Sequence, residues 1–538
     1  MNSTPLFKAF FLGIFKMLSL YLLLILFVTC AWKDSSGGRI GRRTLGGVAF
    51  LAFVVFKDEA HIWEYGVENL LLLLLLCLSY VISVLLRPSV SLPSCFLRTL
   101  LLALSTTIIL SPLDNLAYSN YLIENAHVDP DTVASFKSFL QSITTSGSSN
   151  SPNYCTNGIL NSGLYASNSP YSSSNKLAHY WSQSAYLDYD NHPDRTRWLF
   201  TGDSRTLVPF IANAGAVRPV SYTRRWVNVS KSPDTVTRSP DQAEPYVAVD
   251  CIDRGTDTTL LVLHGLNGGS DEEYVKDLVG KTELSACVMI GRGLMNTPVV
   301  DGRMFNGART GDVGIVAKEI KDATGGGKVV GVGFSMGAIV LSNYIAKAGE
   351  GCSLDAGISV GGGLDMTRNE GYVRSKVLWQ PFLATTLVAQ FFHRFMPFYE
   401  GRLTEEQQRG AEYATSVTDF DRELVAPYNG YGSVMDYYSA MSAGEGWRGR
   451  DDPGKIGGVS VPLAVVNALD DPIVCEGTMM EPGEVVEAGG KNIVYLLTKR
   501  GGHVGYPLGR VRGEGWRWMT ETIEGFVEAV EAVTAEAN

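Results

Sequence analysis

The sequence predicts an α/β fold, a mainly parallel sheet with helices on both faces, preceded by an apolar N-terminal region. From about residue 181, short apolar runs alternate with helical patterns, which indicates parallel strands joined by helices. One apolar run leads through a glycine-rich turn directly into a helix. Leu, Phe, Val and Ile crowd the first fifth of the 538 residues, and a chain of this length exceeds one ordinary domain.

The N-terminal region contains four apolar segments, at 17–32, 44–56, 69–86 and 99–113. Because a helix needs about 20 apolar residues to span a bilayer, the first and third segments are long enough and the other two are marginal. The apolar array that follows the first segment argues against a cleaved signal peptide. We therefore predict that residues 1–115 anchor the chain in a membrane through two to four transmembrane helices.

The charges of the connecting loops suggest an orientation. The first and third loops are basic and the second is acidic. If all four segments span, the basic loops face the cytoplasm and the chain emerges on the lumenal side. If segment 44–56 does not span, the number of spans becomes odd and the chain emerges on the opposite side. The sequon at Asn228 also favours the lumen. We expect an integral membrane protein of the endoplasmic reticulum or another endomembrane, with the side of the C-terminal domain left open.

Residues 116–180 are predicted to form a linker, because much of this stretch is rich in Ser, Asn and Gly. The following 181–538 form the α/β domain. The net charge of −10, without a basic stripe, argues against nucleic acid as a partner. The eight cysteines show no C-x-x-C spacing, so we expect neither a disulfide framework nor a metal site, and no cofactor. No feature of the sequence specifies an oligomeric state.

The expected elements of the domain follow from its apolar periodicity. Strand-like runs lie at 258–263, 286–290, 328–332, 356–360, 461–466 and 492–497, and helices are expected at 311–323 and 337–348. Between the fourth and fifth runs, about 364–458 form an insertion rich in apolar and aromatic residues. We predict that this insertion is a helical lid with its own core, which also lines an acyl-chain pocket.

A candidate nucleophile lies in the motif G-F-S-M-G at 333–337, with Ser335 at its centre. The G-x-S-x-G pattern places a serine on a tight turn between a strand and a helix, where its hydroxyl is exposed and a base can activate it. The pattern alone is weak, because a second copy lies at 357–361. Only the first copy follows a strand-like run and opens a helix, so we interpret Ser359 as a structural strand residue.

The candidate base and acid follow from chain order. In the fold that carries such a turn, the acid and then the histidine come after the serine. Of the histidines after Ser335, His393 lies among aromatic residues ahead of any good acid, whereas His503 follows the last strand-like run. Asp470 and Asp471 follow the preceding run; we favour Asp471 as the acid and expect Asp470 to serve as a turn or capping residue. Asp365 is a distant third choice.

An oxyanion hole needs two backbone N–H groups directed at the developing charge. One is expected from Met336, the residue after the nucleophile. The other is expected from Leu266, in the loop H-G-L-N-G-G that follows the run 258–263. His264 is expected to support that turn, and the side chain of Met336 to form a pocket wall.

Four blocks of the sequence resemble the YheT-like branch of α/β-hydrolases, which includes yeast medium-chain fatty-acid ethyl ester synthase/esterases and mammalian abhydrolase-domain lipases and phospholipases. They are H-G-L-N-G-G-S, G-F-S-M-G-A-I-V-L-S-N-Y, N-A-L-D-D-P-I-V and G-G-H-V-G-Y, in family order within about 245–530. The resemblance implies the α/β-hydrolase fold, a triad of Ser335, Asp471 and His503, and ester substrates with acyl chains. Two features depart from the family pattern. Residues 291–296 read G-R-G-L-M-N, where the family usually has an aromatic residue or Asn and then R-G-C, and several apolar segments replace the single anchor.

Together these features predict a membrane-tethered serine hydrolase that cleaves lipid or fatty-acyl carboxylic esters through an acyl-enzyme. An acyltransferase that makes esters from alcohols would use the same residues, so the sequence does not choose between the two reactions. A non-catalytic receptor or scaffold with this fold is the alternative of another class. The acyl-chain length and the head group are not specified by the sequence.

Overall fold

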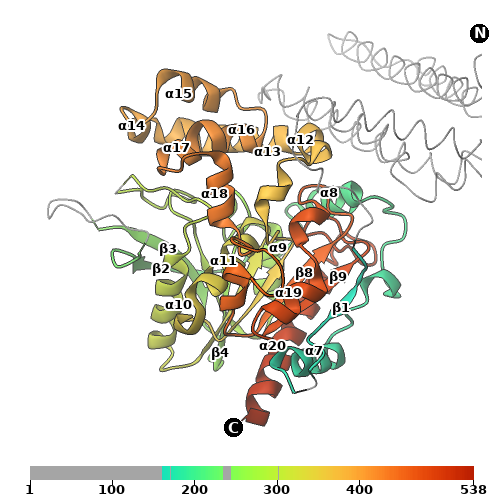
Figure 1. Cartoon of the computed structure of the whole chain (residues 1–538). Coiled ribbons are helices and arrows are strands. Elements are labelled where there is room, and N and C mark those ends of the chain that lie inside the picture. Colours follow the sequence, from blue (N-terminus) through green and yellow to red (C-terminus); the bar gives the residue numbers. More distant parts are fainter. Residues whose placement is uncertain (1–159, 170, 234–243, 301, 538) are drawn as a thin grey trace, which may run out of the picture. The chain divides into compact units, whose positions relative to one another are not determined.

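The computed structural model describes residues 160–169, 171–233, 244–300 and 302–537 (Figure 1). The predicted membrane-anchoring region, 1–115, lies outside these residues, as does most of the predicted linker. Within the described part, none of the helices has the length and apolar character needed to cross a bilayer.

One sheet of nine strands organises the described part. The strands are β1 (Gly163–Tyr165), β2 (Thr223–Asn228), β3 (Tyr246–Ile252), β4 (Thr258–Leu263), β5 (Ser285–Met289), β6 (Lys328–Phe334), β7 (Ala356–Val360), β8 (Leu463–Ala468) and β9 (Ile493–Thr498). Their order across the sheet is β1-β9-β8-β7-β6-β4-β5-β3-β2.

The six central strands, from β9 to β5, are parallel, and β1, β3 and β2 add antiparallel edges. Every residue of β4, β5, β7, β8 and β9 is buried, which explains why these strands are continuous apolar runs in the sequence. The mainly parallel sheet with helices agrees with the predicted α/β-hydrolase fold.

Helices connect the strands. They are α7 (Ser173–Ser184), α8 (Gly202–Asn213), α9 (Glu273–Lys281), α10 (Gly311–Ala323), α11 (Met336–Ala348), α12 (Val373–Leu378), α13 (Gln380–Leu387), α14 (Met396–Tyr399), α15 (Glu405–Glu412), α16 (Val417–Phe420), α17 (Ala426–Tyr428), α18 (Val434–Met441), α19 (Pro482–Ala488) and α20 (Arg517–Ala537).

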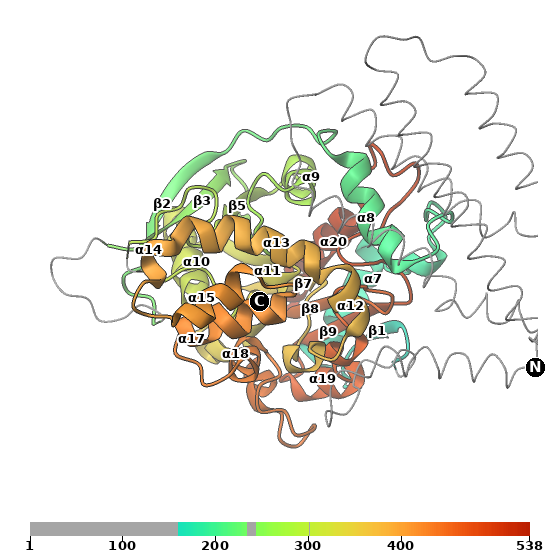
Figure 2. The same cartoon turned by 90° about the horizontal axis from the view of Figure 1, so that it is seen from above.

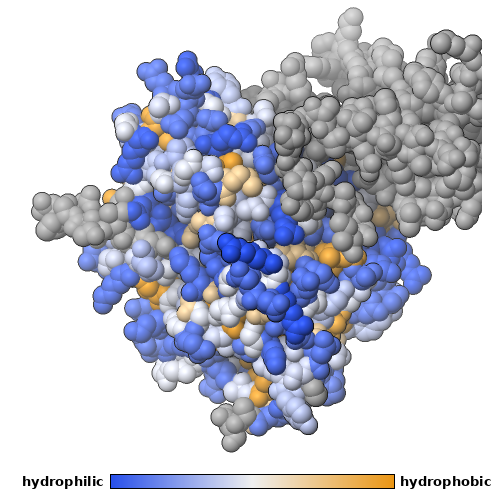
Figure 3. Space-filling view, in the orientation of Figure 1, coloured by the Kyte–Doolittle hydropathy of each residue, from blue (hydrophilic) through white to orange (hydrophobic). Residues whose placement is uncertain are grey.

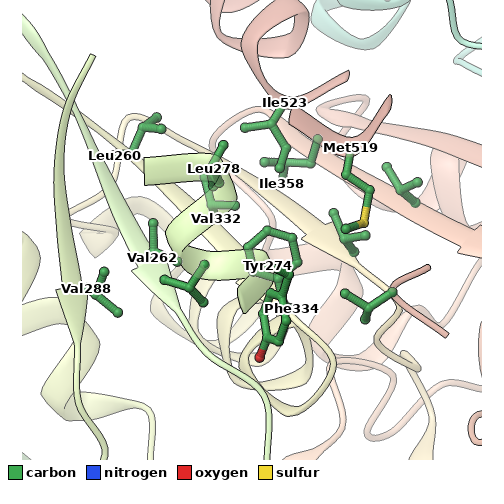
Figure 4. Close-up of a cluster of buried hydrophobic side chains, with 14 of the residues drawn as sticks. Leu260, Val262, Tyr274, Leu278, Val288, Val332, Phe334, Ile358, Met519 and Ile523 are labelled. Carbon is green, nitrogen blue, oxygen red and sulfur yellow. The ribbon is translucent and has the colours of Figure 1, made fainter. Parts of the chain in front are cut away.

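The two faces of the sheet carry separate apolar clusters. Residues of α7, α9 and α20 pack on one face, where Leu260, Val262 and Val332 meet Leu278 and Ile523 (Figure 4). Residues of α10, α11 and α19 pack on the other face. Because successive strand residues point to opposite faces, each fully buried strand contributes to both clusters.

The insertion between β7 and β8 contains α12 to α18, and these helices gather above the sheet in Figure 1 and over it in Figure 2. Its aromatic residues Phe391, Phe392 and Phe395 are buried in the same apolar cluster as one face of the sheet, whereas Phe382 is 43% exposed. The expected separate core of the insertion is therefore not observed. Figure 3 shows hydrophilic residues over most of the visible surface of this part, with hydrophobic ones scattered among them.

The α/β domain begins earlier in the chain than residue 181, where the sequence placed it. Gly163–Tyr165 pairs with β9 as an antiparallel edge strand, and α7 starts at Ser173 inside the predicted linker. In α7, Leu177, Ala178 and Trp181 form a short buried stripe among polar residues. The Ser- and Asn-rich composition obscured this stripe, because three buried side chains are enough to dock a helix of this length.

Candidate active site

Ser335 lies on the turn between β6 and α11, with a positive φ of 53°. Such a backbone conformation is rare for a non-glycine residue and is typical of strained functional turns. The flanking glycines are required by close backbone contacts: a Cβ on Gly333 would lie 2.6 Å from the Cα of Ala338, and one on Gly337 would lie 2.1 Å from the carbonyl oxygen of Leu263. The spacing of the motif therefore follows from packing around the serine.

The structure brings the three predicted triad residues into one hydrogen-bonded chain. The Nε2 atom of His503 lies 2.8 Å from the Oγ atom of Ser335. On the other side of the ring, Nδ1 lies 2.7 Å from Oδ2 of Asp471. His503 and Asp471 are both buried, whereas Ser335 keeps partial exposure, as a nucleophile that meets substrate requires. The chain runs from carboxylate to imidazole to hydroxyl, which is the geometry that activates a serine.

The two neighbouring aspartates have different partners. Oδ1 of Asp471 accepts the N–H groups of Ile473 and Val474, at 2.8 and 2.9 Å, which leaves Oδ2 for the histidine. Asp470 instead pairs with Arg205 and accepts the N–H of Gly502 at 2.8 Å. Asp471 is therefore the aspartate that contacts the imidazole, and Asp470 contacts the loop that carries it. Asp365, the third candidate, bonds locally to Thr367 and Arg368.

Helix α8 supports the loop that carries His503, and the sequence did not predict this role. The backbone N–H of His503 donates to Oγ1 of Thr206 at 2.7 Å. A Cβ on Gly502 would lie 2.7 Å from the carbonyl oxygen of Gly202, so the loop and the helix are in direct contact. The capping pattern at Thr201 and Ser204 signals the start of a helix, but 297 residues separate Thr206 from the histidine.

The insertion between β7 and β8 forms hydrogen bonds next to Asp471, the candidate acid. Tyr372 donates its hydroxyl to the backbone carbonyl of Asp471 at 3.0 Å. Asp203, on α8, accepts a hydrogen bond from Nε1 of Trp379 at 2.8 Å and pairs with Arg374. Burial raises the pKa of Asp203 to about 6, and the Trp379 hydrogen bond opposes that rise. The first helices of the insertion are thus fixed next to the acid loop.

The predicted oxyanion donors, Leu266 and Met336, lie on the two loops that meet at the nucleophile. Among the described residues, no backbone acceptor outside the helices and strands is seen for either N–H. Buried His264 fixes the first loop: its Nδ1 lies 2.7 Å from the carbonyl oxygen of Gly265, and its Nε2 lies 3.3 Å from the N–H of Gly291. Burial lowers the pKa of His264, which favours the neutral ring that this pair of contacts needs.

The other serine and histidine candidates, Ser359 and His393, lie outside the hydrogen-bonded chain of Ser335, His503 and Asp471. Ser359 is buried in β7, and its hydroxyl donates to the backbone carbonyl of Ala338 at 3.2 Å. His393 is exposed on the insertion. The second G-x-S-x-G copy lies in strand β7, as its sequence context indicates.

An apolar wall forms at Gly307 and includes Met336, the residue that follows Ser335. A Cβ added to Gly307 would lie 2.6 Å from the Cε of Met441, 3.0 Å from the Sδ of Met336 and 3.3 Å from the hydroxyl of Tyr437. These side chains belong to a cluster that joins α11 to α18 of the insertion. Met336 therefore contributes its side chain to this wall, next to its candidate oxyanion N–H.

The cysteines correct one expectation. Cys251 and Cys287 face each other across the antiparallel pair β3–β5 and form a disulfide, although their spacing matches no disulfide framework. The pairing could not be predicted because it depends on the register of two strands that lie 36 residues apart in the sequence. Within the ranges that the structure describes, no group of three or more His, Cys, Asp or Glu side chains is placed to hold a metal ion.

Fold and site together define a class: an α/β-hydrolase-type sheet with a serine turn, a late histidine and an acid on successive strand ends. Comparison with known sequences identifies relatives within this class. The chain is 26% identical over 310 residues to a Saccharomyces cerevisiae monoacylglycerol lipase, covering 55% of this chain and 62% of that protein. It is 25% identical over 341 residues to mouse phospholipase ABHD3, covering 62% of this chain and 78% of that protein.

A third relative, the Saccharomyces cerevisiae medium-chain fatty acid ethyl ester synthase/esterase 2, is 26% identical over 293 residues, covering 50% of this chain and 61% of that protein. The match thus spans less than two thirds of both yeast relatives. No family model matches the chain. A solved esterase from Pyrococcus furiosus aligns with a TM-score of 0.34 at 14% identity, covering 57% of this chain and 91% of the esterase.

The chain is therefore similar to α/β-hydrolase superfamily proteins of the abhydrolase-domain lipase branch. These relatives are named as a lipase, a phospholipase and an ester synthase/esterase.

Proposed function

We propose that the chain is a serine hydrolase that cleaves lipid or fatty-acyl carboxylic esters, with Ser335 as nucleophile, His503 as base and Asp471 as acid. The observation that carries this proposal is the continuous chain of contacts from Asp471 through His503 to Ser335, at 2.7 and 2.8 Å. Its partner is an acyl-ester substrate, and no cofactor takes part in the reaction.

In the proposed reaction, Oγ of Ser335 attacks the ester carbonyl while Nε2 of His503 takes the hydroxyl proton. The N–H groups of Leu266 and Met336 stabilise the negative oxygen of the tetrahedral intermediate. His503 then gives its proton to the leaving alcohol, and an acyl-enzyme forms on Ser335. A water molecule, deprotonated by the same imidazole, releases the acid and restores the hydroxyl. Throughout, Asp471 keeps a proton on Nδ1 and stabilises the charged ring.

The apolar wall supports a fatty-acyl group over a small polar ester. Met336, which follows the serine in the chain, meets Met441 and Tyr437 at Gly307, and methionine side chains adapt to flexible apolar partners. The names of the sequence relatives, a monoacylglycerol lipase and a phospholipase among them, agree with this substrate class.

We expect longer acyl chains to be better substrates. Each buried methylene contributes about 0.8 kcal/mol, which is about fourfold in affinity. On purified full-length protein in detergent, kcat/KM for p-nitrophenyl octanoate should exceed that for the butyrate by at least about 10-fold. Rates measured with the Ser335→Ala variant give the background. A kcat/KM that falls from butyrate to octanoate would contradict the acyl-chain proposal.

Product analysis in the same assay separates hydrolysis from transfer. One yeast relative is named for both ester synthesis and ester hydrolysis, so an alcohol is a second candidate acceptor for the acyl group. With ethanol added, we expect free acid as the main product. Ethyl ester in excess of acid would assign acyl transfer to the same three residues.

We further propose that the chain is tethered to a membrane by residues 1–115 and that its C-terminal domain lies on the lumenal side. The apolar segments 17–32 and 69–86 support the tether. The disulfide between Cys251 and Cys287 supports an oxidising compartment, because disulfides persist in the secretory lumen and are rare in the cytosol. Asn228, in its sequon, lies at the end of edge strand β2 with partial exposure.

Protease protection tests this orientation. In sealed microsomes, a C-terminal epitope tag on the full chain should survive protease until detergent opens the vesicles. Its mobility should also rise on glycosidase treatment in the wild type and stay unchanged in Asn228→Gln. Digestion of the tag without detergent would place the domain in the cytoplasm and overturn the proposal.

A further inference from the structure

Tyr274, on α9, reaches the loop that carries the candidate oxyanion donor Leu266. Its hydroxyl oxygen accepts the backbone N–H of Gly265 at 2.8 Å. The hydroxyl also lies close to the nucleophile: a Cβ built on Gly265 would lie 3.0 Å from this oxygen and 3.4 Å from the Cβ of Ser335. Tyr274 has no place in the reaction as proposed above, although it contacts the residue beside an oxyanion donor.

Aromatic packing fixes the ring of Tyr274. Its centroid lies 5.1 Å from that of Phe334, the residue that precedes the nucleophile, in an edge-to-face contact that Figure 4 shows. Phe210 and Trp516 pack against it at 5.9 and 6.1 Å. Burial raises the pKa of Tyr274, so it remains a neutral hydroxyl at any pH where the protein works. The hydroxyl is therefore held at a fixed point by side chains that are themselves part of the core.

Gly265 is held from both sides. Tyr274 binds its N–H, while its carbonyl oxygen accepts the N–H of Gly268 at 3.1 Å and lies 2.7 Å from Nδ1 of His264. A peptide unit is planar and trans, so fixing the Gly265 carbonyl also fixes the opposite direction of the next N–H, that of Leu266. Glycine has the widest backbone freedom of all residues, and both contacts are needed to restrict its φ and ψ.

We infer that Tyr274 is a positioning residue for the oxyanion hole: its hydroxyl holds Gly265 so that the N–H of Leu266 is directed at the developing charge before substrate arrives. The inference rests on the proposed function, because it presumes that an oxyanion forms at Ser335. Preorganised donors stabilise a transition state without reorganisation, and losing one outright costs about 10²–10³-fold in kcat. A donor that is present but loosely held should lose less.

The test is Tyr274→Phe in the full-length protein, which removes the hydroxyl and keeps the ring. We expect kcat for an octanoate ester to fall about 10- to 100-fold, with KM changed by less than about threefold, because the loss appears only in the transition state. The Ki of a trifluoromethyl ketone analogue of the substrate, whose adduct carries the oxyanion, should weaken by a similar factor.

Tyr344→Phe is a matched control. Tyr344 is also 6% exposed, and its hydroxyl accepts a backbone N–H, that of Ser353, at 2.9 Å, on the distant end of α11. This variant should match the wild type in kcat and Ki while losing a similar amount of thermal stability. Wild-type kcat in Tyr274→Phe, equal kcat losses in the two variants, or failure of Tyr274→Phe alone to fold would each overturn the inference. Activity that persists in Ser335→Ala would instead overturn the proposed function.

Discussion

Ser335→Ala is expected to lower kcat for ester hydrolysis by about 10⁶-fold. In the proposed reaction this hydroxyl forms the acyl-enzyme, and it lies 2.8 Å from Nε2 of the base, His503. The measurement is the hydrolysis rate of a medium-chain ester by the full-length protein in detergent. Because the side chain is small and partly exposed, the melting temperature should stay close to that of the wild type.

Ser359→Ala is the matched control for this prediction, because Ser359 occupies the same place in the second G-x-S-x-G copy. Its hydroxyl bonds to the carbonyl of Ala338, so its removal should cost about 1 kcal/mol of stability and leave kcat unchanged. Loss of activity in Ser359→Ala with retention in Ser335→Ala would reverse the assignment of the nucleophile.

Asp471→Asn is expected to lower kcat by about 10⁴-fold with little change in fold. The Asn oxygen can still accept the N–H groups of Ile473 and Val474, which turns its NH₂ group toward Nδ1 of His503. The ring must then carry its proton on Nε2, where it donates toward Ser335 instead of accepting the hydroxyl proton. Activity should be measured at several pH values, because a ring in the wrong tautomer lowers kcat across the neutral range.

Asp470→Asn separates the roles of the two aspartates. This change weakens the contact with Arg205 but leaves the imidazole and its partner intact. We expect a lower melting temperature and a kcat within about 10-fold of the wild type, since the effect reaches the histidine only through its loop. A larger loss of kcat in Asp470→Asn than in Asp471→Asn would make Asp470 the acid.

The centre of the fold could be predicted from the sequence because its strands are buried on both faces. Such strands appear as unbroken apolar runs, and the expected ranges 258–263 and 356–360 coincide with β4 and β7. The edges could not be predicted in this way. Strand β2 exposes most of its residues, and β1 has only three, so neither produces a run that distinguishes a strand from a loop.

Some residues of the candidate site could likewise be predicted from the sequence and others could not. Ser335, Asp471 and His503 follow from local motifs and from their order in the chain, and the structure brings these three together. The residues that support these loops, Thr206 at His503 and Tyr274 at Gly265, accept hydrogen bonds from backbone N–H groups. A hydroxyl that meets a backbone amide leaves no pattern in the sequence, because any residue except proline offers that amide.

Mapping the covalent adduct of a fluorophosphonate tests the central claim most directly, because this reagent modifies only an activated nucleophile. Full-length protein would be labelled in membranes, digested and analysed by peptide mass spectrometry. The account predicts one adduct, on the hydroxyl of Ser335, that disappears in Ser335→Ala and is strongly reduced in Asp471→Asn. An adduct on another residue, with the peptide that contains Ser335 unmodified, would contradict it.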